Sequence, residues 1–300
     1  MVELAVSVGG RSIQVRDAGD PDGVPVVCFH GTPGSRLETD FGADAARRLG
    51  IRLISFDRPG YGLSTAGPVT LSSVARDVEA VADELGVDRF AAFGWSGGGP
   101  FALATAATLP DRVTDVGISG GPAPALERPG ARDALDENDL LALSFLPDRP
   151  ERAADQFLTG NRELLDAMIS VMDDEQAPWI DWMWGSSDPL VVADPGSRRA
   201  VHRSFREALS QGPAAIAWDN VAFIGPWGVD LDDVSCPVHL WYGDRDQMVD
   251  RVNGEWLRQR LAHADLTVFA GEGHLLPLRH WDEMLRALIR VPGRSADPGR

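Results

Sequence analysis

One short stretch, residues 89–109, limits what this chain can fold into more than any other. An apolar run ends at Phe93, the sequence Gly-Trp-Ser-Gly-Gly follows with Ser96 at its centre, and a small-residue pattern typical of a helix runs from Phe101 to Leu109. The pattern predicts a strand, a sharp turn and a helix, with a hydroxyl at the turn. In a turn of this kind, strained backbone lifts the hydroxyl clear of the sheet, and the N–H groups after it point at an incoming anion.

A second Gly-x-Ser-x-Gly sequence is centred on Ser119 and also follows a plausible strand. Such pentapeptides arise by chance in a chain rich in glycine and serine, so the match alone decides little. Pro122 and Pro124 come next, where the turn needs an uninterrupted helix. The sequence therefore favours Ser96 as the nucleophile, and Ser119 is interpreted as a strand-end residue near the mouth of the site.

Composition excludes several other classes of function. The chain has 300 residues, 44% of them hydrophobic, which is enough for one large domain or for a core domain with an insertion. Its formal net charge of −17 argues against nucleic acid and anionic membrane surfaces as partners. All of its basic residues are arginine, and the lack of lysine rules out a Schiff base, a Ser-Lys dyad and a phosphate-loop lysine.

The sequence offers no ligand set for a metal and predicts no cofactor. Cys28 and Cys236 lie in or beside apolar strand patterns, which favours buried reduced thiols over a bridge or a metal site. The N-terminus lacks a basic leader with an apolar core, and no run of 18 apolar residues occurs, so we expect a cytoplasmic protein without membrane insertion. The expected partner is a small-molecule substrate, and assembly into a homodimer stays open.

The order of patterns along the chain predicts an α/β fold. Gly9-Gly10 joins two alternating segments as a hairpin. The continuous apolar runs Val24–Phe29 and Ile51–Phe56, separated by a helical stretch from Ser35 to Leu49, are typical of buried parallel strands with a crossover helix. Strand and helix alternation stops between residues 121 and 236, which predicts an inserted helical cap. Residues 1–120 and 237–290 would form the core, and 291–300 a flexible tail.

Polar residues follow the ends of several predicted strands, where an open parallel sheet binds its ligand. They include Ser96, the segment Gly-Asp-Arg-Asp at 243–246, and Gly-Glu-Gly-His at 271–274. Four segments outside the Ser96 turn resemble motifs of the α/β-hydrolase fold superfamily: His-Gly-Thr-Pro-Gly at 30–34, Asp-Arg-Pro-Gly-Tyr-Gly-Leu-Ser at 57–64, Gly-x-x-Asp at 243–246 and Gly-His at 273–274. The resemblance implies a mostly parallel sheet of about eight strands flanked by helices, with an inserted cap.

The chemistry and the resemblance assign roles to five residues. A serine hydroxyl is a weak nucleophile near neutral pH, so an imidazole must accept its proton and a carboxylate must hold that imidazole. Ser96, His274 and Asp246 take these catalytic roles, while Asp244 matches the family spacing less well and is interpreted as capping a turn. The resemblance also implies an oxyanion hole formed by the N–H groups of Thr32 and Gly97.

We therefore expect a serine esterase that cleaves an ester, thioester or lactone of a mid-sized hydrophobic small molecule. Tryptophans that could line its pocket, or equally pack in the core, are Trp95, Trp179, Trp182, Trp184, Trp218 and Trp227. One alternative is an aminopeptidase similar to proline iminopeptidases. A second is a ligand-binding, lyase or carbon–carbon cleaving protein, because a fold does not fix a function. Serine at position 96 argues against the family members that dehalogenate or open epoxides, which carry aspartate there.

Overall fold

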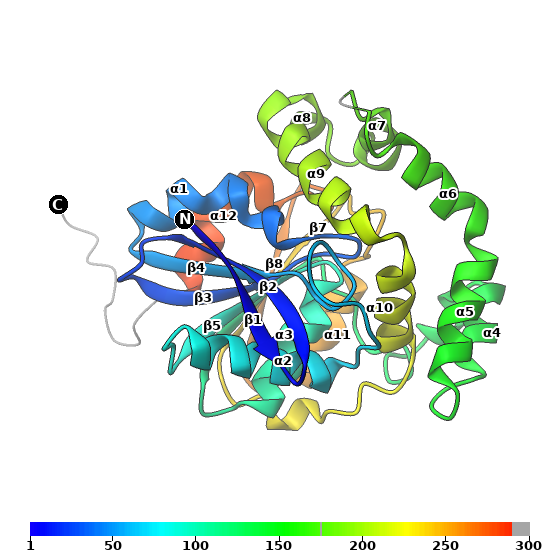
Figure 1. The fold of residues 1–300 in the computed structure, drawn as a ribbon, viewed down its shortest axis with the longest axis horizontal. Helices are drawn as coiled ribbons and strands as arrows, with labels where there is room; N and C mark the ends of the chain where they lie inside the picture. Colours follow the sequence, from blue (N-terminus) through cyan, green and yellow to red (C-terminus); the bar gives the residue numbers. More distant parts are fainter. Residues whose placement is uncertain (175, 290–300) are drawn as a thin grey trace.

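The computed structural model describes residues 1–174 and 176–289, and an eight-stranded sheet runs through the middle of this part (Figure 1). The strand order is β1-β2-β4-β3-β5-β6-β7-β8; β1 and β2 are antiparallel to their neighbours, and every other pair is parallel. The predicted α/β class with a mostly parallel sheet is confirmed. The strands are β1 (Val2–Val8), β2 (Arg11–Gly19), β3 (Val24–Phe29), β4 (Ile51–Phe56), β5 (Phe90–Trp95), β6 (Val113–Ser119), β7 (Val238–Gly243) and β8 (Ala264–Phe269).

Helices cover both faces of the sheet and fill the long connection between β6 and β7. The α-helices in the described part are α1 (Ala43–Arg48), α2 (Leu71–Glu84), α3 (Gly98–Thr108), α4 (Glu137–Leu143), α5 (Pro150–Gly160), α6 (Arg162–Val171), α7 (Pro178–Trp184), α8 (Pro189–Ala193), α9 (Pro195–Ala208), α10 (Ala214–Ile224), α11 (Val252–Arg260) and α12 (Pro277–Leu288). Four short 3₁₀ helices are η1 (Arg36–Gly42), η2 (Arg132–Ala134), η3 (Leu209–Gln211) and η4 (Leu231–Asp233).

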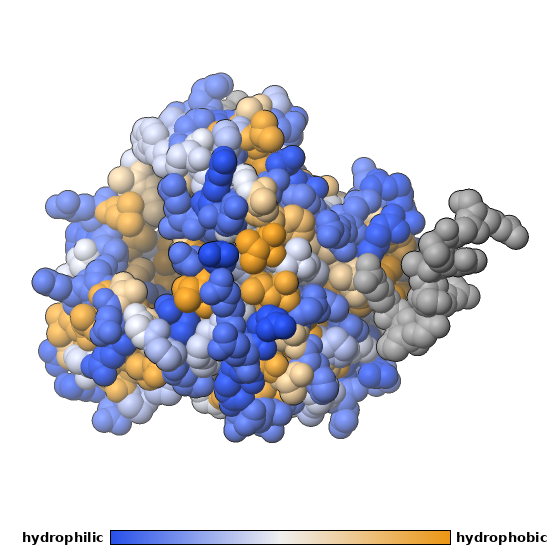
Figure 2. Space-filling view, turned by 180° about the vertical axis from the view of Figure 1, so that it is seen from behind, coloured by the Kyte–Doolittle hydropathy of each residue, from blue (hydrophilic) through white to orange (hydrophobic). Residues whose placement is uncertain are grey.

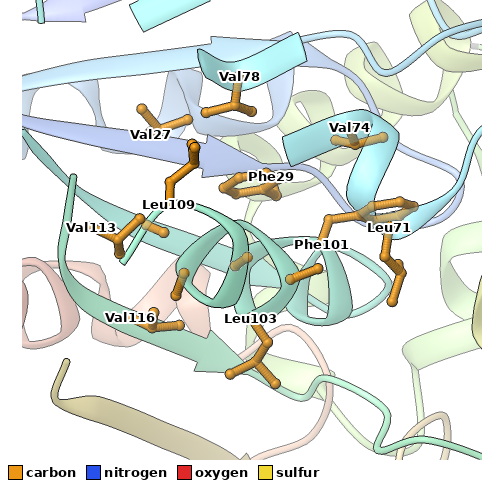
Figure 3. Packing of buried hydrophobic residues seen from close by; sticks show 14 of the residues in the cluster. Val27, Phe29, Leu71, Val74, Val78, Phe101, Leu103, Leu109, Val113 and Val116 are labelled. Carbon is orange, nitrogen blue, oxygen red and sulfur yellow. The ribbon is translucent and has the colours of Figure 1, made fainter. Parts of the chain in front are cut away.

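The alternation of side chains along β3 divides the core into two layers. Val27 and Phe29 face a cluster that includes α2 and α3, whereas Val26 and Cys28 face a second cluster that includes α1 and α12. Figure 3 shows Val27 and Phe29 packed beneath the valines of α2 and beside Phe101 of α3. Apolar side chains point to both faces of the central strands, which explains why these strands read as continuous apolar runs.

The N-terminal hairpin and the first crossover both follow the sequence patterns. Val8 pairs with Arg11 across Gly9 and Gly10, both of which have positive φ, so the predicted hairpin is confirmed. The helical stretch expected from Ser35 to Leu49 is present as two consecutive helices, η1 and α1. They meet at Gly42, where a Cβ atom would overlap the indole of Trp281, so packing against α12 sets the break.

Helices α4 to α10, which we call the inserted helices, form an arc along one side of the sheet (Figure 1). They lie between β6 and β7 in the chain, within the segment where strand and helix alternation was expected to stop. The tail expected at 291–300 lies outside the described residues. Among the helices of the described part, none has the length and apolar character needed to span a membrane. On the face in Figure 2, hydrophilic residues predominate, with hydrophobic residues in small groups between them.

Candidate functional site

Ser96 stands at the end of β5 in a backbone conformation that few side chains adopt. Its φ is +53°, and the only other non-glycine residue with positive φ among those described is Ala177. From Phe90 to Pro100 every residue except Ser96 is buried. The Ser96 N–H donates to the Ser119 carbonyl at 2.8 Å, so the neighbouring strand end holds the turn in place. The strained turn thus keeps one hydroxyl accessible on an otherwise buried element.

The glycines around Ser96 are required by close backbone approach. A Cβ atom on Gly94 would lie 2.5 Å from the Gly98 carbonyl oxygen, and one on Gly98 would overlap the Phe29 carbonyl. Only glycine allows β5 to pass so directly into α3 beside β3. Gly97 is the N-cap residue of α3, so its N–H lies at the positive end of that helix, where anions are stabilised.

His274 and Asp246 are joined by a direct contact behind this turn. Nδ1 of His274 lies 2.7 Å from Oδ2 of Asp246, and the other oxygen of Asp246 accepts the N–H groups of Met248 and Val249 at 2.8 and 2.9 Å. Asp246 follows β7 and His274 follows β8, so two strand ends supply the pair. Asp244 does not join it, because its carboxylate accepts the Gly271 N–H at 2.7 Å within a neighbouring turn.

Thr32 lies against Gly97. The two residues have to be this close if their N–H groups are to bind the same anion. A Cβ atom on Gly97 would overlap the Thr32 hydroxyl, which measures how closely the two loops approach. That hydroxyl donates to Asp219 of α10 at 2.6 Å. Asp219 therefore ties the loop after β3 to the inserted helices.

Ser96 and His274 line the same hollow, between the sheet and the inserted helices, with an empty volume of about 560 Å³ including its mouth. Most of the walls are apolar, from the core and from α7 and α9. The lining residues are Gly31, Thr32, Pro33, Glu38, Phe41, Trp95, Ser96, Met183, Trp184, Ala200, Val201, Ser204, Phe205, Met248, His274, Leu275 and Leu278.

Of the six tryptophans named as pocket candidates, Trp95 and Trp184 line this hollow. Trp179 is buried behind it against Phe205, with 4.6 Å between ring centroids. Trp182 is 73% exposed. It lies two residues before Trp184 in α7, and in a helix this spacing places the two side chains on opposite sides. The other two candidates pack in hydrophobic clusters away from the hollow; these are Trp218 and Trp227.

Glu38 is a pocket residue that the sequence interpretation missed. Its carboxyl accepts the Gly31 N–H at 2.9 Å and contributes the one carboxyl group to the hollow's described lining. Burial raises the pKa of Glu38 to about 8. The Ser-x-x-Glu spacing from Ser35, typical of a helix N-terminus, was a visible signal, but the side chain reaches the loop after β3 instead.

Both cysteines are buried free thiols. Within residues 1–174 and 176–289, no three His, Cys, Asp or Glu side chains are grouped so that they could hold a metal ion.

Comparison with known proteins adds a family and several relatives. A family model described as alpha/beta hydrolase fold matches residues 24–280. A 2-hydroxy-6-oxononadienedioate/2-hydroxy-6-oxononatrienedioate hydrolase from Klebsiella pneumoniae is 24% identical, over 97% of this chain and 95% of its own length. A probable proline iminopeptidase from Streptomyces coelicolor is 28% identical, over 88% of this chain and 87% of its own.

Solved structures agree on the architecture. The structure of an esterase from a Rhodococcus species aligns with a TM-score of 0.65 at 22% identity, covering 95% of this chain and 97% of that one. At this identity, the likeness concerns the fold alone.

Proposed function

This chain belongs to the alpha/beta hydrolase fold family, and on that premise we propose that it is a serine hydrolase acting through an acyl-enzyme on an ester, thioester or lactone. The observation that carries the proposal is the 2.7 Å contact between His274 Nδ1 and Asp246 Oδ2, beside a hollow that Ser96 and His274 both line. Three polar groups from three strand ends then have the roles that acyl transfer needs.

In the proposed reaction, the Ser96 hydroxyl attacks the acyl carbon while His274 takes its proton. Asp246 holds the imidazole with Nδ1 protonated and stabilises the cation that forms. The N–H groups of Thr32 and Gly97 bind the oxygen that becomes negative, a contribution of about 3 kcal/mol per donor in comparable sites. His274 then gives the proton to the departing alcohol, thiol or ring hydroxyl, and water repeats the sequence to release the acid and free Ser96.

The walls of the hollow support a mid-sized hydrophobic substrate. Phe41, Trp184 and Phe205 are aromatic, and Met183 and Met248 add flexible apolar surface. We propose that residues 121–236 act as a cap over a core made of 1–120 and 237–290, since α7 and α9 of that segment contribute side chains to these walls. Specificity would then come from the inserted helices.

A fluorophosphonate probe tests the mechanism directly. We expect it to label the protein once, with the label mapping to Ser96 by peptide mass spectrometry, and Ser96→Ala to lose both labelling and p-nitrophenyl butyrate hydrolysis. Ser119→Ala is the matched control, because it removes the other Gly-x-Ser-x-Gly hydroxyl, and it should keep both. Label on Ser119, or full activity in Ser96→Ala, would move the chemistry elsewhere.

An aminopeptidase is the second candidate, favoured by the relative from Streptomyces coelicolor and by the Glu38 carboxyl in the hollow. A carboxyl there could pair with a substrate ammonium. Against this, burial raises the pKa of Glu38 to about 8, which leaves the carboxyl largely neutral at pH 7 in the absence of a cation. Prolyl-p-nitroanilide compared with p-nitrophenyl butyrate separates the two, and faster turnover of the anilide would replace the esterase proposal.

The Klebsiella relative is named as a hydrolase of an oxo-dienedioate, and on this basis carbon–carbon cleavage is the third alternative that the experiments test. A labelled Ser96 with no turnover of either chromogenic substrate would favour that class.

A further inference from the structure

Asp188, just before α8 in the inserted helices, makes an unusual set of contacts with the segment that carries His274. It is 4% exposed. Its Oδ1 accepts the N–H groups of Gly273 and Leu275 at 3.1 and 3.0 Å, and its Oδ2 accepts the N–H of His274 itself at 3.0 Å. The Ser187 hydroxyl donates to Oδ2 at 2.7 Å. One carboxylate thus binds three consecutive backbone donors, which uses nearly all of its acceptor capacity.

The residue before His274 has to be glycine for this arrangement. A Cβ atom on Gly273 would overlap Oδ2 of Asp188 and lie 2.6 Å from its Cγ. The Gly-His pair at 273–274 is therefore matched to a carboxylate 85 residues away in the sequence. That match joins the inserted helices to the loop after β8.

The main chain of His274 is fixed at its carbonyl as well. Nε1 of Trp95, next to Ser96, donates to the His274 carbonyl at 3.0 Å, while Asp246 holds the ring at Nδ1. Of these contacts, the one with Asp188 comes from outside the sheet and its strand ends. Loss of Asp188 would free the backbone that sets where the imidazole lies and leave Asp246 to orient the ring alone.

We propose that Asp188 is a positioning residue that sets the His274 backbone so that the imidazole serves both Asp246 and Ser96. The inference rests on the proposed function, because it assigns His274 as the base. Displacement of a reacting group by about 1 Å can cost about 100-fold in rate, so a carboxylate that never touches substrate can still control kcat. Substrate binding in the apolar hollow does not depend on it, so KM should be largely insensitive.

Asp188→Asn is the sharpest test, because it keeps the volume and replaces one oxygen by an NH₂ group that must face backbone N–H donors. We expect kcat for p-nitrophenyl butyrate, corrected for active sites by fluorophosphonate titration, to fall about 10- to 100-fold while KM changes little. The low-field proton resonance of the His274–Asp246 hydrogen bond should shift or broaden. Asp244→Asn is the matched control, since that carboxylate caps Gly271 in the same loop without touching His274.

A corrected kcat and a proton resonance equal to those of the unmodified protein would overturn the proposal. If Asp188→Asn fails to fold, Ser187→Ala is measured in its place, because it removes one hydrogen-bond donor to Asp188 and leaves the carboxylate. We expect a several-fold fall in kcat, and an unchanged kcat contradicts the proposal. Ser96→Ala distinguishes a failure of the proposed function from a failure of the role proposed for Asp188. Full activity in that variant defeats the proposed function, whereas an unaffected Asp188→Asn beside an inactive Ser96→Ala defeats only the role of Asp188.

Discussion

Arg58 and Asp219 form an ion pair that is buried on both sides, with 2.6 Å between Nη2 and Oδ2. Arg58 follows β4, and its guanidinium also donates to the His30 and Gly31 carbonyls at 2.5 and 2.9 Å. The Tyr61 hydroxyl donates to the same Asp219 oxygen at 2.7 Å. The pair therefore fixes the loop that leads into Thr32 at two points. Arg58 binds the carbonyls of the loop, and Asp219 binds the Thr32 hydroxyl.

The first prediction follows from leaving one of these charges alone. Asp219→Ala should reduce the free energy of unfolding by about 3–5 kcal/mol, because the Arg58 guanidinium stays buried without its counter-charge. Asp173→Ala is the matched control; Asp173 pairs with Arg206 on the surface, and its loss should cost under about 1 kcal/mol. Urea unfolding monitored by tryptophan fluorescence measures both, and equal losses would contradict the argument.

The second prediction separates the two carboxylates after β7. Asp246→Asn keeps an oxygen for the turn but cannot accept a hydrogen bond through its NH₂ group, so His274 loses the acceptor that selects its tautomer. We expect kcat to fall by about 10⁴-fold with the fold retained. Asp244→Asn, two residues away and bonded to Gly271, should leave kcat unchanged. Steady-state kinetics on both variants decides, and a larger loss in Asp244→Asn would exchange their roles.

The buried strands were predictable because both of their faces are apolar. The runs Val24–Phe29 and Ile51–Phe56 have the same bounds as β3 and β4. The end of a buried strand is marked by polar residues, so the positions of Ser96 after β5 and Asp246 after β7 could be inferred as well.

The contributions of the inserted helices could not be predicted, for a physical reason that Asp188 and Asp219 illustrate. Both are single acidic residues in a chain of 45 acidic residues, and nothing local distinguishes a carboxylate that binds a distant loop from one that faces water. Their partners lie 85 or more residues away in the sequence. Such pairings follow from how the inserted helices pack on the sheet, which periodicity alone does not specify.

The third prediction concerns pH and Glu38. Burial raises its pKa from 4.5 to about 8, so between about pH 5 and pH 8 the folded protein holds a proton that the unfolded chain has already released. The folded state binds more protons over this range, and stability therefore falls as the pH rises through it. Glu38→Gln removes this dependence, because the amide keeps the shape of the protonated carboxyl and does not ionise.

Relative to Glu38→Gln, we expect the free energy of unfolding of the unmodified protein to drop by about 3 kcal/mol between pH 5 and pH 8, less than the full shift implies because the hollow admits water. Glu84→Gln, an exposed glutamate on α2, is the control and should give a difference that does not vary with pH. Urea titrations at four pH values provide the comparison. A constant difference for Glu38→Gln would mean that the carboxyl is ionised throughout.

The fourth prediction uses two tryptophans of α7 that differ in the side of the helix they occupy. Trp184 is 4% exposed and lines the hollow, while Trp182 is 73% exposed. Trp184→Leu replaces an indole in the wall by a smaller side chain, so a longer acyl chain should fit. We expect the ratio of kcat/KM for p-nitrophenyl octanoate to that for the butyrate to rise about tenfold, since one added methylene is worth about 10-fold or more in an apolar pocket.

Trp182→Leu makes the same chemical change on the opposite side of α7, and its ratio should not move. The ratio is measured on one enzyme preparation with two substrates, so it is independent of how much of the variant is folded. That independence matters because Trp184 is also packed against Trp179, with 6.0 Å between ring centroids, and its loss will lower stability. An equal rise of the octanoate-to-butyrate ratio in both variants would mean that the stability of α7 controls selectivity and that the acyl chain does not contact Trp184.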